Sequence, residues 1–75
     1  MFDRTIFATR VKELRKSKKL TQSELGEILS LSVQAVNDIE KGRKITTFDN
    51  LFILAEFFEV TSDYLLGLSD IKERR

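Results

Sequence analysis

The sequence predicts an all-α fold, a compact bundle of five helices with a helix-turn-helix at its centre. The 75 residues contain no proline and three glycines, which favours helices joined by tight turns. Apolar residues recur at helical spacing, and no segment shows the sustained alternation that is typical of a strand. A residue that can cap a helix also precedes each apolar pattern.

The first helix is expected over residues 4–18, with Asp3 or Thr5 as its cap. Its apolar stripe follows helical spacing and consists of Phe7, Val11 and Leu14. Arg10 lies beside this stripe, so we expect it to have a partner elsewhere, because burying an unpaired charge is costly. The other basic residues of this segment are expected to face outward: Lys12, Arg15, Lys16, Lys18 and Lys19.

Two short helices follow, separated by a three-residue turn. Thr21 and Glu24 form the pattern of a capping box, which marks the start of the second helix. Ser30 ends that helix and Ser32 caps the third, and this arrangement predicts a helix-turn-helix. The side chains expected in the core are Leu25, Ile28, Leu29, Leu31, Val36 and Ile39.

The rest of the chain predicts two further helices and a tail. Gly42 is expected to stop the third helix, Thr47 to cap the fourth and Thr61 to cap the fifth. The fourth helix is apolar on most of its circumference, which predicts burial on more than one side. We expect a domain over residues 1–67 and a flexible basic tail over residues 68–75.

The composition excludes several classes of function. There is no cysteine and no histidine, which argues against disulfides, a metal centre and the commonest general base, so we expect neither an enzyme nor a cofactor. No apolar segment is long enough to span a membrane, no signal peptide is evident, and the expected location is cytoplasmic. No small-molecule ligand is evident. The net charge is +1, but residues 1–19 hold seven basic and two acidic side chains, as expected of a polyanion binder or a solvated helix face.

The chain resembles the phage-repressor and Cro-type (XRE-like) helix-turn-helix family over about residues 7–67. The resemblance lies in three segments in this order: RVKELRKSKKLTQSEL, SVQAVNDIEKG and VTSDYLLG. It implies a lambda-repressor-like fold, with the third helix in the major groove of double-stranded DNA. The DNA-binding residues that it implies are Thr21, Gln22, Ser32, Val33, Gln34, Asn37, Asp38, Lys41, Arg43 and Lys44.

The resemblance implies different roles within this set. Gln22 would bond a phosphate and brace the third helix, and Gln34 would pair with adenine. Asn37 would contact either a base or a phosphate. Two positions that often hold polar or basic side chains in the family are here Val33, which suits a thymine methyl, and Asp38, which repels phosphate but can accept from cytosine.

The resemblance also implies two structural features. Arg10 is expected to form an ion pair with Glu40, and Ser30 stands where the family often has a glycine with positive φ. A homodimer is expected on a palindromic site, with a dimer surface near Val60, Tyr64 and Leu68. The alternative for these three residues is that they close the core. The implied function is a sequence-specific transcriptional regulator, with repression as the expected mode. The alternative is a protein-interaction or antitoxin-like module on the same fold with little intrinsic DNA binding.

Overall fold

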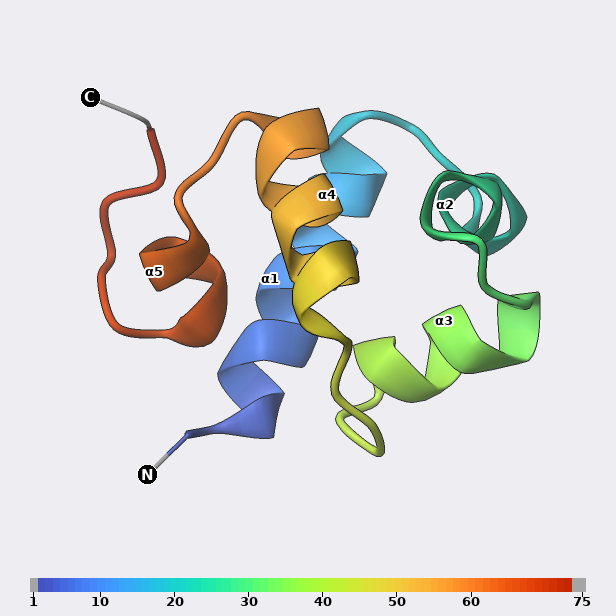
Figure 1. The fold of residues 1–75 in the computed structure, drawn as a ribbon, viewed down its shortest axis with the longest axis horizontal. Helices are drawn as coiled ribbons and strands as arrows, with labels where there is room; N and C mark the ends of the chain where they lie inside the picture. Colours follow the sequence, from blue (N-terminus) through green and yellow to red (C-terminus); the bar gives the residue numbers. More distant parts are fainter. Residues whose placement is uncertain (1, 74–75) are drawn as a thin grey trace.

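The computed structural model describes residues 2–73 and contains five helices (Figure 1). They are α1 (Arg4–Ser17), α2 (Gln22–Leu29), α3 (Val33–Glu40), α4 (Phe48–Phe58) and α5 (Ser62–Leu66). Within the described part of the chain, the β pairing consists of one isolated bridge between Val60 and Glu73. The predicted all-α fold with a central helix-turn-helix is therefore confirmed.

Each helix begins at a side chain that accepts a hydrogen bond from a backbone amide of the first turn. Asp3, rather than Thr5, caps α1, and the capping box of Thr21 and Glu24 is complete in both directions. The remaining caps are Ser32, Thr47 and Thr61, as the sequence predicted. Because these bonds satisfy amides that a helix leaves without partners, they fix where each short helix starts.

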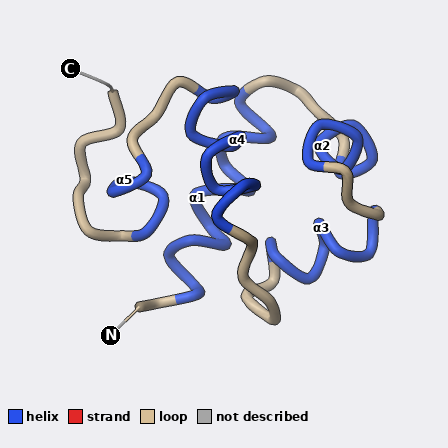
Figure 2. The backbone as a smooth tube through the Cα atoms, viewed as in Figure 1, coloured by secondary structure: helices blue, strands red, loops and turns tan. Residues whose placement is uncertain are grey.

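Helix α1 lies at the centre and contacts both sides of the molecule. Figure 2 shows α2 and α3 on one side of α1 and α4, with α5 and the C-terminal stretch on the other. The core draws at least one fully buried side chain from every helix: Phe7, Val11, Leu25, Val36, Leu54 and Leu65. Since α2, α3 and α5 have eight residues or fewer, packing on this core stabilises them more than their own propensity does.

The turn between α2 and α3 depends on two backbone positions. Ser30 ends α2 with φ 58° and ψ 41°, the left-handed conformation that the family resemblance suggested. At Gly26 a Cβ atom would lie 2.5 Å from the carbonyl oxygen of Leu31, so only glycine lets the turn approach α2 this closely. No local pattern around Gly26 indicates this role.

Helix α4 is less buried than its composition predicted. Leu54, Ala55 and Phe58 face the core, whereas Phe48 is 88% and Phe52 is 66% exposed. The prediction of burial on more than one side is therefore wrong for these two phenylalanines. They lie one helical turn apart, on the side of α4 that α1, α2 and α5 leave uncovered.

The described part of the tail contacts the rest of the domain. The amide of Thr61 donates to the carbonyl oxygen of Lys72 at 3.2 Å, and the Thr61 hydroxyl donates to that of Ile71 at 3.3 Å. The boundary at residue 67 stays a prediction, and residues 74 and 75 lie outside the described part.

None of the helices in residues 2–73 could span a bilayer, because the longest, α1, has 14 residues and crossing takes about 20.

Candidate nucleic-acid interface

Helix α3 presents a polar surface while its other side lies in the core. Val36 and Ile39 are buried, as predicted, and the Ser32 hydroxyl accepts from the amide of Ala35 at 3.1 Å. Val33 is 48% exposed and Gln34 lies on the same outward surface. The first turn of α3 is therefore accessible to a partner, and the buried side chains on the opposite side of the helix fix its position.

A buried ion pair holds the end of α3 against α1. Arg15 donates from Nε to Glu40 Oε2 at 2.7 Å and from Nη2 to Oε1 at 3.0 Å, a bidentate arrangement. The side chain of Glu40 is 2% exposed and that of Arg15 is 11% exposed. Arg15 also donates to the carbonyl oxygen of Leu20 at 2.8 Å, which ties the connection between α1 and α2 to the same site.

The predicted ion pair between Arg10 and Glu40 is wrong, and Arg15 occupies the position expected for Arg10. Both arginines border the apolar stripe of α1, but five residues rotate a helix by about 140°, so they face different sides. Arg10 instead donates to the carbonyl oxygens of Tyr64 and Ser69 and pairs with Asp70 at 2.8 Å. The expectation that Arg10 has partners elsewhere is confirmed, whereas the outward orientation predicted for Arg15 is wrong.

Glu40 also orients a chain of amide side chains. Because a carboxylate only accepts hydrogen bonds, Gln22 must present its Nε2 to Glu40, and these atoms lie 3.2 Å apart. The same Nε2 donates to Asn37 Oδ1 at 3.3 Å. Gln22 thus braces α3, while its predicted phosphate contact stays a prediction. Asn37 is left with its Nδ2 group as the donor for an outside partner.

A second carboxylate, Asp38, orients Gln34 and the turn after α3. Gln34 Nε2 donates to Asp38 Oδ1 at 3.1 Å, which leaves Gln34 with its carbonyl oxygen and one amide hydrogen. Asp38 also lies 3.6 Å from Arg43 Nη1 and 3.9 Å from Lys44 Nζ, and its side chain is 13% exposed. Its negative charge is therefore offset within the chain, and a direct base contact by Asp38 stays a prediction.

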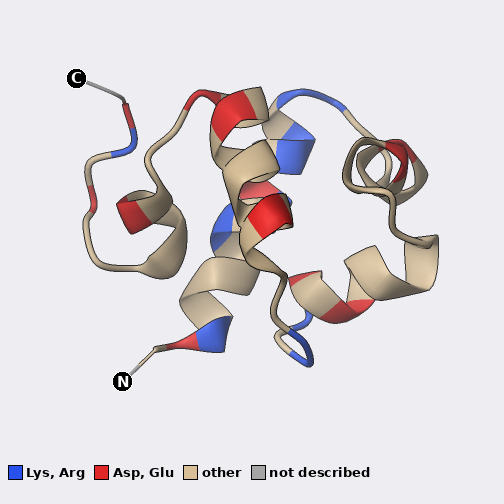
Figure 3. Ribbon diagram, viewed as in Figure 1, with Lys and Arg blue, Asp and Glu red and all other residues tan. Residues whose placement is uncertain are grey.

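The charges around α3 are distributed unevenly. Figure 3 colours the charged positions of α3 as acidic residues alone, whereas basic residues occupy the turn after it and the connection between α1 and α2. The exposed basic residues of the turn are Lys41, Arg43 and Lys44. Thr21, at the start of α2, is exposed as well. The polar surface of α3 thus adjoins a basic turn that is suited to phosphate contacts.

The predicted dimer surface divides into a buried and an exposed part. Val60 is 2% exposed, so its inclusion is wrong: it packs in the core behind the start of α5. Tyr64 is partly covered by Arg10, whose guanidinium carbon lies 4.2 Å from the ring centroid. Leu68 is 75% exposed. Leu68 is therefore the residue of the three that is most available to a partner.

The family of the chain follows from its sequence match. The family described as "Helix-turn-helix" matches residues 11–65, which include all of α2, α3 and α4. The chain belongs to this helix-turn-helix family.

Within residues 2–73, no group of three or more His, Cys, Asp or Glu side chains is arranged to hold a metal ion.

The relatives of this helix-turn-helix chain are regulators by name. The chain is 35% identical over 65 residues to the uncharacterized HTH-type transcriptional regulator YobD of Bacillus subtilis, covering 87% of this chain and 58% of that protein. It is 37% identical over 61 residues to the HTH-type transcriptional activator BcrR of Enterococcus faecalis, covering 81% of this chain and 30% of that protein. The chain thus spans little more than half of YobD and less than a third of BcrR.

Solved structures share the arrangement of the helices. The P22 c2 repressor, determined in complex with a synthetic operator, is 26% identical with a TM-score of 0.78, covering 85% of this chain and 97% of that one. The restriction-modification controller protein C.AhdI of Aeromonas hydrophila is 28% identical with a TM-score of 0.73, covering 84% and 96%. These matches confirm the repressor-like helix-turn-helix fold.

Sequence reasoning missed Arg15 as the partner of Glu40. The signal was present, since Arg15 lies four residues after Val11 and so borders the apolar stripe as closely as Arg10 does. What the sequence lacked was the side of α1 on which α3 packs. The contacts of Asp38 with Gln34 and with the basic turn were missed as well, although Gln34 lies four residues before Asp38 on the same helix and this spacing places the two side chains side by side.

Proposed function

We propose that this domain is a sequence-specific double-stranded DNA-binding transcriptional regulator that places α3 in the major groove. The observation that carries the proposal is the exposed first turn of α3, which presents Gln34, is braced by the Arg15–Glu40 pair and adjoins a basic turn. The membership of the helix-turn-helix family and the similarity to a repressor determined with its operator support it. We infer a cytoplasmic protein without a catalytic role, with repression as its mode of action.

The amide orientations give each polar residue of α3 a specific task. Gln34 offers one acceptor and one amide hydrogen, which matches the N6 and N7 edge of adenine. Asn37 offers donors, which suit a phosphate oxygen or an acceptor on a base edge. Val33 suits the methyl group of thymine. Lys41, Arg43 and Lys44 supply phosphate contacts, which set register and affinity.

The proposed binding unit is a homodimer on a palindromic operator. A single domain of this size buries little surface on DNA, and α3 contributes no positive charge of its own. Two half-sites about one helical turn, roughly 34 Å, apart would let both copies of α3 enter the major groove on one side of the duplex.

In vitro selection from a random double-stranded library, followed by mobility shift across a salt series, tests the proposal. We expect an enriched palindrome, and affinity that falls by about 0.9 log unit per neutralised phosphate for each decade of salt. Failure to retard any DNA at the lowest salt would contradict it. That result would favour an interaction or antitoxin-like module, to which the exposed Phe48 and Phe52 also point.

A further inference from the structure

A large apolar surface lies beside the basic turn and takes no part in the proposed DNA contacts. Its members come from the start of α1, the connection to α4, α4 itself and the end of α5. We call this surface the apolar face and define it by Phe2, Ile6, Ile45, Phe48, Phe52 and Leu68, all of which are at least 36% exposed.

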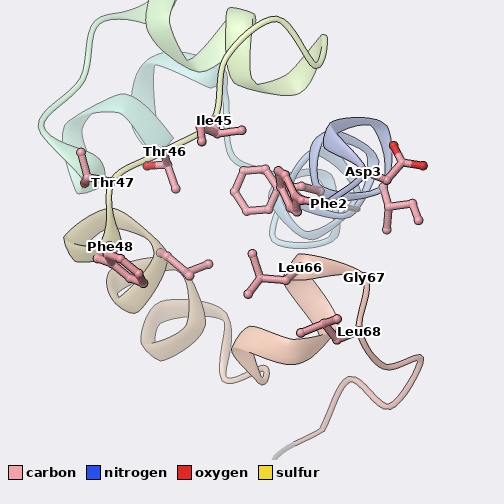
Figure 4. Close-up of a pocket in the computed structure, with 12 residues that line it drawn as sticks. Phe2, Asp3, Ile45, Thr46, Thr47, Phe48, Leu66, Gly67 and Leu68 are labelled. Atoms are coloured by element: carbon pink, nitrogen blue, oxygen red, sulfur yellow. The ribbon is translucent and has the colours of Figure 1, made fainter.

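The apolar face consists of a ridge and a hollow. Phe48, at 88% exposure, projects from the first turn of α4, and Phe52 continues the ridge one turn later. Beside Phe48 the surface forms a hollow of about 590 Å³, with Phe2, Leu66 and Leu68 on its other side (Figure 4). Among the described residues that line the hollow, Asp3 alone carries a charge.

The extent of the apolar face matches the centre of a protein interface. Phe2, Phe48 and Phe52 are 41%, 88% and 66% exposed, roughly the surface of two whole phenylalanines, which is on the order of 300–500 Å². That area equals the largest apolar patch of a typical monomer. Ile6, Ile45 and Leu68 enlarge it toward the roughly 800 Å² per partner of a standard interface.

The shape of the apolar face favours a second copy of this chain as its occupant. A two-fold interface uses the same patch on both partners, so the patch must complement itself. Here a projecting aromatic ridge stands next to an apolar hollow on one surface. When two copies face each other across a two-fold axis, the Phe48 side chain of each can enter the hollow of the other.

We propose that the apolar face is the homodimer interface and that Phe48 is its central anchor. The proposal rests on the homodimer put forward above and names its surface. It keeps Leu68 from the predicted dimer surface, omits the buried Val60, and moves the contact to the start of α1 and α4. A few side chains that become fully buried supply most of the energy of an interface, and aromatic side chains, phenylalanine included, are enriched at the centre of such interfaces.

Sedimentation equilibrium on the full chain tests this interface. We expect a dimer for the wild type, and a dimer Kd raised at least about tenfold by Phe48→Glu, because a carboxylate would have to enter an apolar hollow. Ile71→Glu is the matched control: Ile71 is 47% exposed but does not belong to the apolar face, so its dimer Kd should not change. Thermal unfolding by circular dichroism should show both variants folded, since both side chains are exposed.

Cross-linking gives an independent measurement, because the chain contains no cysteine. Equimolar Phe48→Cys and Leu68→Cys chains, mixed and oxidised, should form a mixed disulfide dimer faster than Ile71→Cys mixed with Leu68→Cys. A Phe48→Glu variant that keeps the wild-type dimer Kd would overturn the proposal. A wild type that stays monomeric at the highest concentration, with and without operator DNA, would overturn it too.

DNA binding separates the interface from the proposed function. Phe48→Glu should bind a single half-site like the wild type at low salt, but should lose the cooperative binding of the full palindrome. If Phe48→Glu abolishes the dimer and neither protein binds any DNA, the interface stands and the proposed function fails. If both proteins bind the palindrome with equal cooperativity, the interface is overturned and the DNA-binding function stands.

Discussion

Arg15 and Arg10 leave the same helix on different sides and hold its two neighbouring regions in different ways. Arg15 pairs with the Glu40 carboxylate, whose side chain is 2% exposed, and thereby holds α2 and α3 against α1. We call α2 and α3 the helix-turn-helix half. Arg10 donates to two backbone carbonyls and pairs with the Asp70 carboxylate, whose side chain is 99% exposed. These contacts hold α5 and the tail against α1. The half that carries the proposed DNA contacts is therefore held by a buried ion pair, whereas the ion pair of the other half involves a carboxylate at the protein surface.

This difference indicates where each half can tolerate change. A buried bidentate pair fixes both the distance and the angle between α1 and α3, so the amides of Gln22 and Asn37 keep one orientation. The contacts of Arg10 set no such orientation at a functional surface. The α4 and α5 half instead carries the apolar face, where shape and exposure matter more than polar geometry.

Removing Arg15 is the most severe test of the comparison. Arg15→Ala should lower the free energy of unfolding by about 3–5 kcal/mol, because it leaves the Glu40 carboxylate buried without its cationic partner. Urea denaturation followed by circular dichroism measures the loss. The double variant Arg15→Ala, Glu40→Gln is the control and should recover part of it. An unfolding midpoint equal to that of the wild type would refute the role of this pair.

Removing Arg10 should cost less. Arg10→Ala removes hydrogen bonds from a charged donor to the Tyr64 and Ser69 carbonyls, for which about 1.5–3 kcal/mol is expected. Asp70→Ala should change the midpoint little, because its side chain is almost fully exposed. The same denaturation experiment reports both variants. A larger loss for Arg10→Ala than for Arg15→Ala would reverse the comparison.

Gln34 tests the function of the helix-turn-helix half. Gln34→Ala should relax the preference at one base pair in each half-site, at a cost of about 1–3 kcal/mol for the selected operator. Competition mobility shifts with operators changed at single positions measure this. Lys44→Ala is the contrast, since losing a phosphate contact should weaken all sequences alike and reduce the salt slope by about one. A uniform loss for Gln34→Ala would make Gln34 a backbone contact.

The smallest expected effect concerns the ends of α2 and α4, one in each half. Ser30 and Glu59 both adopt left-handed conformations, with φ of 58° and 55°. Ser30→Gly and Glu59→Gly should each be neutral or stabilise the fold by up to about 1 kcal/mol, because glycine adopts this conformation without strain. Calorimetric melting temperatures measure the change. A clear fall for either variant would show that its side chain contributes more than the strain costs.

Local signals in the sequence determined the helices and their ends. Each cap bonds an amide two or three residues away, so Thr21, Ser32, Thr47 and Thr61 could be identified without knowing the fold, whereas for α1 the sequence left Asp3 and Thr5 as alternatives. The apolar stripe of α1 follows from an equally short spacing, whereas the left-handed end at Ser30 was suggested by the family resemblance. The fold and the outward face of α3 were predictable for this reason.

The tertiary structure alone decided the partners of Arg15 and Arg10 and the exposure of the phenylalanines. Arg15 and Glu40 are 25 residues apart, and Arg10 and Asp70 are 60 apart, so their pairing depends on which side of α1 each helix covers. The same packing leaves Phe48 and Phe52 exposed, although apolar composition alone predicts burial. Periodicity places a residue on one side of its own helix, but only the packing of the five helices decides which residues of the other helices contact that side.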